Sequence, residues 1–272
     1  MRIVILGANT ADPGWRYLIR EEWADNRGVR LHYLDSNQDT TPALLPLVYI
    51  HGAWGAAENF LPEMKALAPR RCISVALRGR GKSDAPETGY SFDDNVSDVE
   101  AIVDHAGLKN FCLMGWSIEV TYSISYASLH QKSVAGLILL DYPARYPKWP
   151  AGWAERLISD PSIAGNPDTL RGLRGLERES SEVLLRDSLS EIKCSVLVIG
   201  GRHPDALLKP EHIDNYRQYL PNVQVVVFGD SGHNVSEPDF DRFIQTLESF
   251  LECQDNRVSA HPKGGSSRAL AF

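Results

Sequence analysis

Short apolar runs alternate along the chain with stretches in which apolar residues recur every three or four positions. The short runs predict strands, and the stretches between them predict helices that bury one face. We predict strands at residues 29–34, 45–50, 72–77, 111–114, 134–140, 196–199 and 223–228. This alternation is typical of a parallel sheet covered by helices. The sequence therefore predicts an α/β fold with a mostly parallel, doubly wound sheet.

One interval between the predicted strands breaks the alternation. Residues 142–193 contain no clear strand but carry several aromatic residues and prolines, followed by an amphipathic, helix-like stretch at 181–189. Because ligands of open α/β sheets bind at the carboxyl ends of the strands, we interpret 142–193 as a lid or cap insertion over that end. The alternative is a surface excursion whose aromatic side chains pack on the domain.

The remaining organisation follows from the limits of the alternating pattern. We expect an α/β core over residues 20–141 and 194–252, preceded by an N-terminal extension at 1–19. The last predicted helix begins near Pro238 and ends at about Leu251. The polar residues beyond it, 253–272, predict a disordered tail.

Composition narrows the class of partner. The 272 residues carry a formal net charge of -7, which gives no electrostatic support to nucleic-acid binding. No stretch approaches the roughly 20 apolar residues of a membrane span. None of the four cysteines forms a CxxC pair, so zinc-ligand spacing of that kind is absent. We expect a cytoplasmic protein that binds a small molecule and neither nucleic acid nor membrane, with a homodimer left open.

A glycine-serine turn follows the predicted strand at 111–114. Gly115-Trp116-Ser117 is succeeded by a helical run that begins at Val120. A tight turn between strand and helix projects a serine hydroxyl out of the strand end, and the helix N-terminus favours negative charge there. Ser117 is therefore a candidate nucleophile, with Trp116 beside it.

A second glycine turn, at 51–55, directly follows the strand at 45–50. Such a turn allows a backbone N–H to face a reacting carbonyl, and the residue after the nucleophile supplies another. The donors of this oxyanion hole would be Ala53 and Ile118. Trp54, within the same turn, is expected beside the substrate.

An acid and a base candidate follow two later strands. Asp205 ends the turn 200–205 after the strand at 196–199, and His233 lies in a glycine turn after the last strand. Asp205, His233 and Ser117 all come at carboxyl ends of predicted strands, where they can meet.

Together these motifs resemble the α/β-hydrolase superfamily over about residues 20–252, in which the order along the chain is Ser, Asp, His. The resemblance implies a triad of Ser117, Asp205 and His233, a short cap domain and no cofactor. In some relatives the acid follows an earlier strand, and that position is Asp141 here. We expect Asp205, because the turn 200–205 fits the more frequent arrangement.

One residue departs from the family pattern. Glu119 stands where the family usually has the last glycine of Gly-x-Ser-x-Gly. Either Glu119 lies harmlessly at the helix N-terminus, where its charge is favourable, or it distorts the turn and weakens hydrolysis. The first alternative implies a serine hydrolase that cleaves an ester, lactone or thioester of a small or medium lipophilic substrate through an acyl-enzyme. The second implies a non-hydrolytic receptor, or a lyase-type or cyclase-type biosynthetic enzyme.

Overall fold

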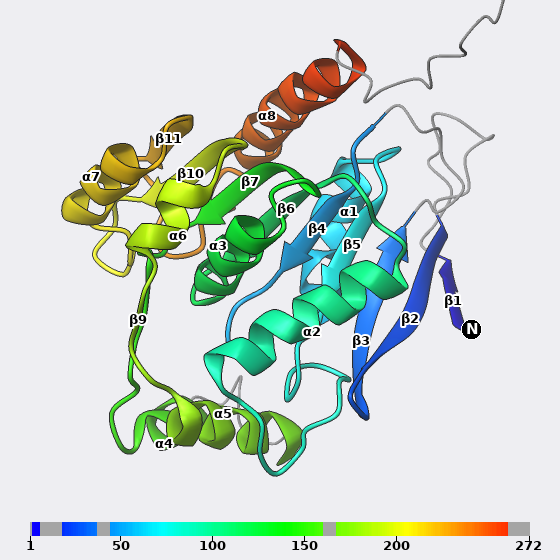
Figure 1. Ribbon diagram of the computed structural model, residues 1–272, viewed down its shortest axis with the longest axis vertical. Coiled ribbons are helices and arrows are strands. Elements are labelled where there is room, and N and C mark those ends of the chain that lie inside the picture. The colour runs from blue at the N-terminus through cyan, green and yellow to red at the C-terminus, as the bar shows by residue number, and fades with distance from the viewer. Residues whose placement is uncertain (1, 6–17, 37–43, 160–166, 261–272) are drawn as a thin grey trace, which may run out of the picture.

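The computed structural model describes residues 2–5, 18–36, 44–159 and 167–260. In these segments a nine-stranded sheet has the order β1-β2-β3-β5-β4-β6-β7-β10-β11 (Figure 1). Its strands are β1 (Arg2–Ile5), β2 (Leu18–Asn26), β3 (Val29–Ser36), β4 (Leu47–Ile50), β5 (Cys72–Val75), β6 (Phe111–Trp116), β7 (Val134–Leu140), β10 (Ser195–Gly201) and β11 (Val223–Phe228).

The larger part of the sheet is parallel. Strands β5, β4, β6, β7, β10 and β11 run in one direction, whereas β1, β2 and β3 form an antiparallel edge that joins the sheet through β3 and β5. The predicted fold class is therefore confirmed. Strand β1 lies within the predicted N-terminal extension and adds an edge strand; residues 1 and 6–17 of that extension lie outside the described residues.

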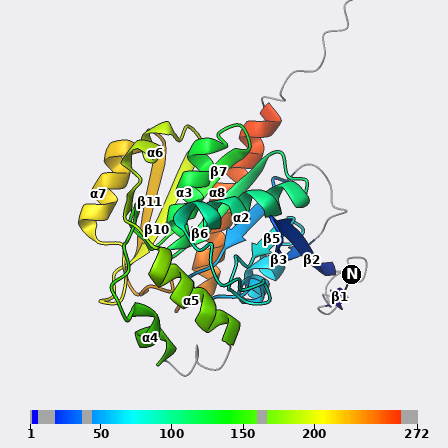
Figure 2. The same ribbon diagram turned by 60° about the horizontal axis from the view of Figure 1, so that its bottom comes forward.

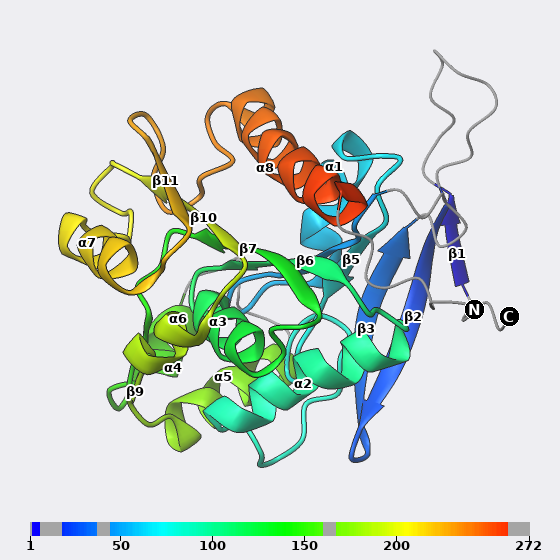
Figure 3. The ribbon, with the colours of Figure 1, turned by 45° about the horizontal axis from the view of Figure 1, so that its top comes forward.

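Helices cover both faces of the sheet (Figure 3). One face is covered by α2 (Phe92–His105), α3 (Glu119–Leu129), α6 (Arg186–Glu191) and α7 (Pro210–Tyr219), and the other by η1 (Ala57–Phe60), α1 (Leu61–Ala66) and α8 (Phe240–Ala260). Each strand feeds both cores because its side chains alternate. In β4, for example, Val48 and Ile50 join one apolar cluster while Leu47 and Tyr49 join the other.

The segment between β7 and β10 forms a unit set apart from the sheet (Figure 2). It contains β8 (Arg145–Tyr146), α4 (Trp153–Ile158), α5 (Pro167–Glu179) and β9 (Val183–Leu184), and α6 leads back to the sheet. The prediction of a helix-like stretch at 181–189 is partly wrong, since the short strand β9 precedes α6 there. Helix α5 packs backbone to backbone on the loop after β5: a Cβ on Gly172 would lie 2.6 Å from the Gly79 carbonyl oxygen.

The predicted tail begins too early. Helix α8 continues to Ala260, so residues 253–260 are helical, and 261–272 lie outside the described residues. The extension is fixed by a buried ion pair, in which Arg70 Nη2 lies 2.7 Å from Asp255 Oδ2. Asp255 Oδ1 also accepts the Leu45 backbone N–H at 2.8 Å. None of the described helices, α8 included, is long and apolar enough to cross a membrane.

The Arg70–Asp255 pair gives a stability prediction. We expect Asp255→Ala to lower the free energy of unfolding by about 3–5 kcal/mol, because the buried guanidinium would lose its carboxylate. The exposed Glu252 of the same helix is the matched control, and Glu252→Ala should change the value by less than about 0.5 kcal/mol. Urea denaturation at pH 7 measures both. Equal effects of the two substitutions would show that the pair does not hold α8 in place.

Candidate active site

Ser117 occupies a strained turn between β6 and α3. Its φ is 61°, in the left-handed region that is uncommon for residues other than glycine. The turn needs a close approach of strand and helix, since a Cβ on Gly115 would lie 2.4 Å from Ser123 Oγ and 2.8 Å from the Glu119 carbonyl oxygen. The Ser117 N–H donates to the Leu140 carbonyl at 3.1 Å, which ties the turn to the end of β7. This strained strand–turn–helix is the geometry of a nucleophile elbow.

Three side chains from three loops form a line of hydrogen bonds. Ser117 Oγ lies 3.0 Å from His233 Nε2, and His233 Nδ1 lies 2.8 Å from Asp141 Oδ2. The Asp141 side chain is fully buried, whereas the His233 side chain is 22% exposed. Such a line can take a proton from the serine hydroxyl while the carboxylate stabilises the imidazolium that results.

Asp141 is held by backbone donors as well as by the imidazole. Its Oδ1 accepts N–H groups of Gly201 at 3.2 Å and Leu208 at 3.3 Å, and its Oδ2 accepts that of Leu207 at 2.8 Å. These donors all come from the end of β10 and the loop that follows. The carboxylate is thus both oriented and compensated for its burial.

The expectation that Asp205 contacts the imidazole is wrong. Asp205 is exposed, and its Oδ2 accepts the backbone N–H of His233 at 3.2 Å, not a ring nitrogen. That hydrogen bond is the main reason why the pKa of Asp205 is lowered. Strand β7 lies between β6 and β10 in the sheet, so Asp141 at its end is nearer to Ser117 than the loop after β10. Asp205 instead fixes the turn: a Cβ on Gly232 would lie 2.4 Å from its Oδ2.

Trp116 positions the histidine. Its Nε1 donates to the His233 carbonyl at 3.0 Å, and its ring is stacked on the imidazole with the centroids 5.2 Å apart. Gly52 allows the indole to fit, since a Cβ there would lie 3.3 Å from the ring. The sequence predicted Trp116 beside Ser117 at the substrate site, but gave no sign of its contact with His233.

The two expected oxyanion donors belong to different turns, and both residues are buried. Ala53 follows β4 and Ile118 directly follows Ser117, with exposed fractions of 6% and 3%. Within the described segments, neither backbone N–H donates to a backbone carbonyl in the turns and loops. Both are therefore available to a reacting oxygen, and their role as donors stays a prediction.

A cavity of about 440 Å³ opens at Ser117 and His233. Trp54 lines it as expected and is 44% exposed. The sequence did not single out Glu63 of α1, which also lines the cavity; burial raises the pKa of its carboxyl to about 7. Other lining residues are Tyr49, Gly52, Ala53, Gly55, Asn59, Phe60, Trp116, Leu140, Asn234, Val235, Ser236 and Phe243. None of these comes from the described part of 142–193.

Glu119 does not distort the elbow. It is the first residue of α3, fully buried, and its Oε1 accepts a hydrogen bond from Arg80 Nη2 at 3.3 Å. Arg80 is itself buried and donates from Nη1 to Asn95 Oδ1 at 2.7 Å. Burial raises the pKa of the Glu119 carboxyl to about 8, although Arg80 opposes the shift. This shift favours the neutral carboxyl, and the Arg80 guanidinium offsets whatever negative charge the group carries behind Ser117.

Comparison with known proteins bears on the fold that carries this site. Residues 46–166 match the family model described as alpha/beta hydrolase fold. The chain is 27% identical over 244 residues to the AB hydrolase superfamily protein YisY of Bacillus subtilis, covering 75% of this chain and 91% of that protein. It is 22% identical over 212 residues to N-formylmaleamate deformylase of Pseudomonas putida, covering 65% and 76%. An esterase from Exiguobacterium antarcticum superposes with a TM-score of 0.68 at 23% identity, covering 85% and 98%, and so shares the fold.

Substitution of the two aspartates separates their roles. Asp141→Asn should slow the reaction of Ser117 with a fluorophosphonate about 1,000-fold or more, because the amide cannot stabilise the imidazolium. Asp205→Asn should slow it less than about tenfold, the effect of weakening one hydrogen bond. Labelling rates followed by intact mass measure both. A larger loss in Asp205→Asn than in Asp141→Asn would contradict the observed geometry.

The raised pKa of Glu119 predicts a pH-dependent stability. The folded protein keeps a proton on this carboxyl up to about pH 8, whereas the unfolded chain releases it near pH 4.5. Between these values the group costs stability as pH rises, by up to about 1.4 kcal/mol per pH unit. Between pH 6 and pH 8, the free energy of unfolding of Glu119→Gln should therefore rise by about 2 kcal/mol relative to that of the wild type. Urea denaturation at both pH values measures it.

The exposed carboxyl of Glu155 provides the control for this experiment. Glu155→Gln should follow the wild-type pH profile, because the substitution changes a surface side chain and no group of the core. Profiles of wild type and Glu119→Gln that stay parallel from pH 6 to 8 would show that Glu119 is ionised in the folded protein.

Proposed function

Since the chain belongs to the α/β-hydrolase fold superfamily, we propose that it is a serine hydrolase. It cleaves a carboxylic ester, lactone or thioester through an acyl-enzyme. The observation that carries this proposal is the hydrogen-bonded line from Ser117 Oγ through His233 to the buried Asp141. Relatives that are themselves hydrolases support the reaction class.

The geometry supports a two-step reaction. His233 Nε2 takes the proton of Ser117 Oγ as the oxygen attacks the carbonyl carbon, while Nδ1 donates to Asp141. The backbone N–H groups of Ala53 and Ile118 stabilise the oxyanion. His233 then protonates the leaving alcohol or thiol, and the acyl group stays on Ser117. Water deprotonated by His233 releases the acid and restores the serine.

The cavity supports a small or medium substrate of mixed character. Its volume of about 440 Å³ lies at the lower end of the range for small-molecule sites. Tyr49, Trp54, Phe60 and Phe243 offer aromatic surface, which fits a lipophilic group. Glu63 supplies the one carboxyl group among the described residues that line the cavity, and it can hydrogen-bond a polar substituent.

The observed environment of Glu119 favours hydrolysis over the non-hydrolytic alternatives. Those alternatives rest on a distorted elbow, but Glu119 turns toward Arg80, and the Ser117 hydroxyl remains 3.0 Å from His233 Nε2. We keep residues 142–193 as a proposed cap. The four unpaired cysteines fit a reducing compartment, so we also propose a cytoplasmic location.

Labelling with a fluorophosphonate tests the proposal without knowledge of the substrate. We expect a stoichiometric adduct on the wild type, none on Ser117→Ala, and hydrolysis of short p-nitrophenyl esters that both Ser117→Ala and His233→Ala abolish. Circular dichroism confirms that the variants fold. Turnover that survives in Ser117→Ala but not in His233→Ala would exclude an acyl-enzyme and favour a lyase-type or cyclase-type reaction.

A further inference from the structure

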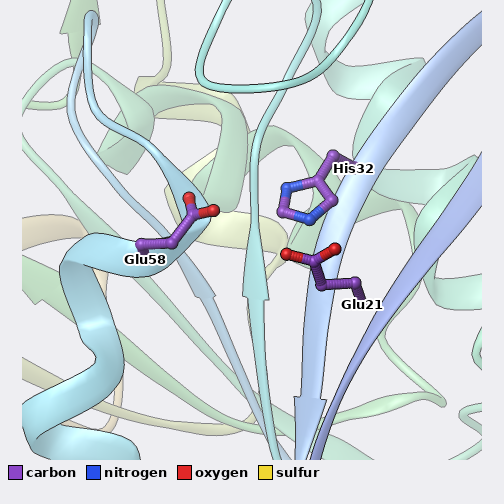
Figure 4. Close-up of side chains that lie close together, drawn as sticks. All are labelled: Glu21, His32 and Glu58. Carbon is purple, nitrogen blue, oxygen red and sulfur yellow. The ribbon is translucent and has the colours of Figure 1, made fainter. Parts of the chain in front are cut away.

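Three side chains that can bind metal meet on the antiparallel side of the sheet. Glu21 of β2, His32 of β3 and Glu58 of η1 each place a ligand atom within 4.8 Å of the others (Figure 4). We propose that they form a site for a divalent transition-metal ion of the zinc type. One imidazole nitrogen and two carboxylate oxygens are a ligand set that Zn²⁺ accepts, with water completing the coordination. This site is separate from the proposed active site and does not depend on the proposed function.

The state of His32 points to a missing ligand. Its side chain is fully buried, yet within the described residues neither ring nitrogen has a hydrogen-bond partner. Buried polar atoms without a partner are rare and usually mark a bound water or ion. The backbone of His32 is satisfied on both sides, by Ser83 Oγ and by the Ala76 N–H, and its ring packs 4.9 Å from that of Trp23. The ring is thus held in place with its nitrogens unused.

The three groups lie close enough to share an ion, yet the imidazole is hydrogen-bonded to neither carboxylate. The imidazole makes no hydrogen bond with Glu21 or Glu58, although the ligand atoms lie within 4.8 Å of one another. Ligands about 2.0–2.2 Å from a tetrahedral Zn²⁺ lie roughly 3.3 Å apart. Because the three ligand atoms already lie within 4.8 Å of one another, small side-chain movements would bring them to that spacing.

Lys82 is the group that an ion must displace. Its Nζ lies 2.6 Å from Glu21 Oε1 and 2.7 Å from Glu58 Oε1, so the ammonium neutralises one of the two negative charges. The Lys82 side chain is 47% exposed and can swing into solvent. Ion pairs with so exposed a partner contribute little to stability. A divalent ion would neutralise both carboxylates and give His32 a partner, which the ammonium does not.

The site would connect the sheet edge to the active-site region. Glu58 lies in η1, whose neighbours Asn59 and Phe60 line the cavity at Ser117. Lys82 follows the loop that carries Arg80, the partner of Glu119. A bound ion would therefore fix η1 against β2 and β3, and would replace the mobile Lys82 contact with a rigid one.

Isothermal titration of the chelator-treated full chain with zinc chloride tests the site. We expect one zinc ion per chain. Lys82→Gln should bind it at least about tenfold more tightly than the wild type. Glu58→Gln and His32→Asn should bind it at least about tenfold more weakly, since even changes to residues that only contact a ligand cost about tenfold in metal affinity. Glu155→Gln, which removes a carboxylate paired with Arg174 at the surface, should bind as the wild type does. Cobalt(II) titration of Lys82→Gln should give the visible absorption of a tetrahedral site.

Three outcomes would overturn the proposal. They are a wild type that binds no zinc, equal affinities of Glu58→Gln and Glu155→Gln, and a Lys82→Gln variant that binds no more tightly than the wild type. Because His32→Asn changes a buried residue, Glu21→Gln serves as the second ligand variant if circular dichroism shows that His32→Asn is unfolded. Retained affinity in Glu21→Gln would equally exclude the site.

Discussion

The candidate active site depends on how one buried carboxylate is satisfied. Asp141 accepts N–H groups from Gly201, Leu207 and Leu208 and from the ring of His233. Without these donors, a carboxylate at the carboxyl end of a central strand would be too costly to bury. The same hydrogen bonds hold the loop after β10 against the end of β7 and set the orientation of the imidazole. The position of the base relative to Ser117 is thus a consequence of the hydrogen bonds that hold the Asp141 side chain inside the protein.

Glu119 shows how a departure from a family pattern can be accommodated by a second residue far away in the sequence. The sequence left open whether the bulky side chain at the start of α3 distorts the turn. Gly115 keeps the close approach on the strand side, while the Glu119 side chain turns to the buried Arg80. Burial of the carboxyl is reflected in its proton affinity, since its pKa is raised to about 8. The elbow therefore keeps its shape, and the adaptation shows in the electrostatics of the interior.

What could be predicted from the sequence follows the range of the interactions involved. Strands β4, β7 and β10 are strong local signals, because their apolar runs are buried between two layers of helices. Strand β2 was missed, since its sequence LIREEWADN places charges on a half-exposed edge and its burial depends on β3. The choice between Asp141 and Asp205 depends on which strand lies next to β6, which spacing along the chain does not reveal. For the same reason Glu21, His32 and Glu58 carry no metal-binding motif, because only the folded sheet brings them together.

The stacking of Trp116 on His233 has an optical consequence. An indole in contact with an imidazole loses fluorescence when that imidazole becomes a cation, because the cation accepts an electron from the excited ring. Trp116 is one of six tryptophans, but it is the one stacked on the candidate base in the described structure. Its emission should therefore fall as His233 gains a proton. The protein carries its own spectroscopic reporter for the charge of the histidine, stacked on the imidazole that the proposed chemistry uses.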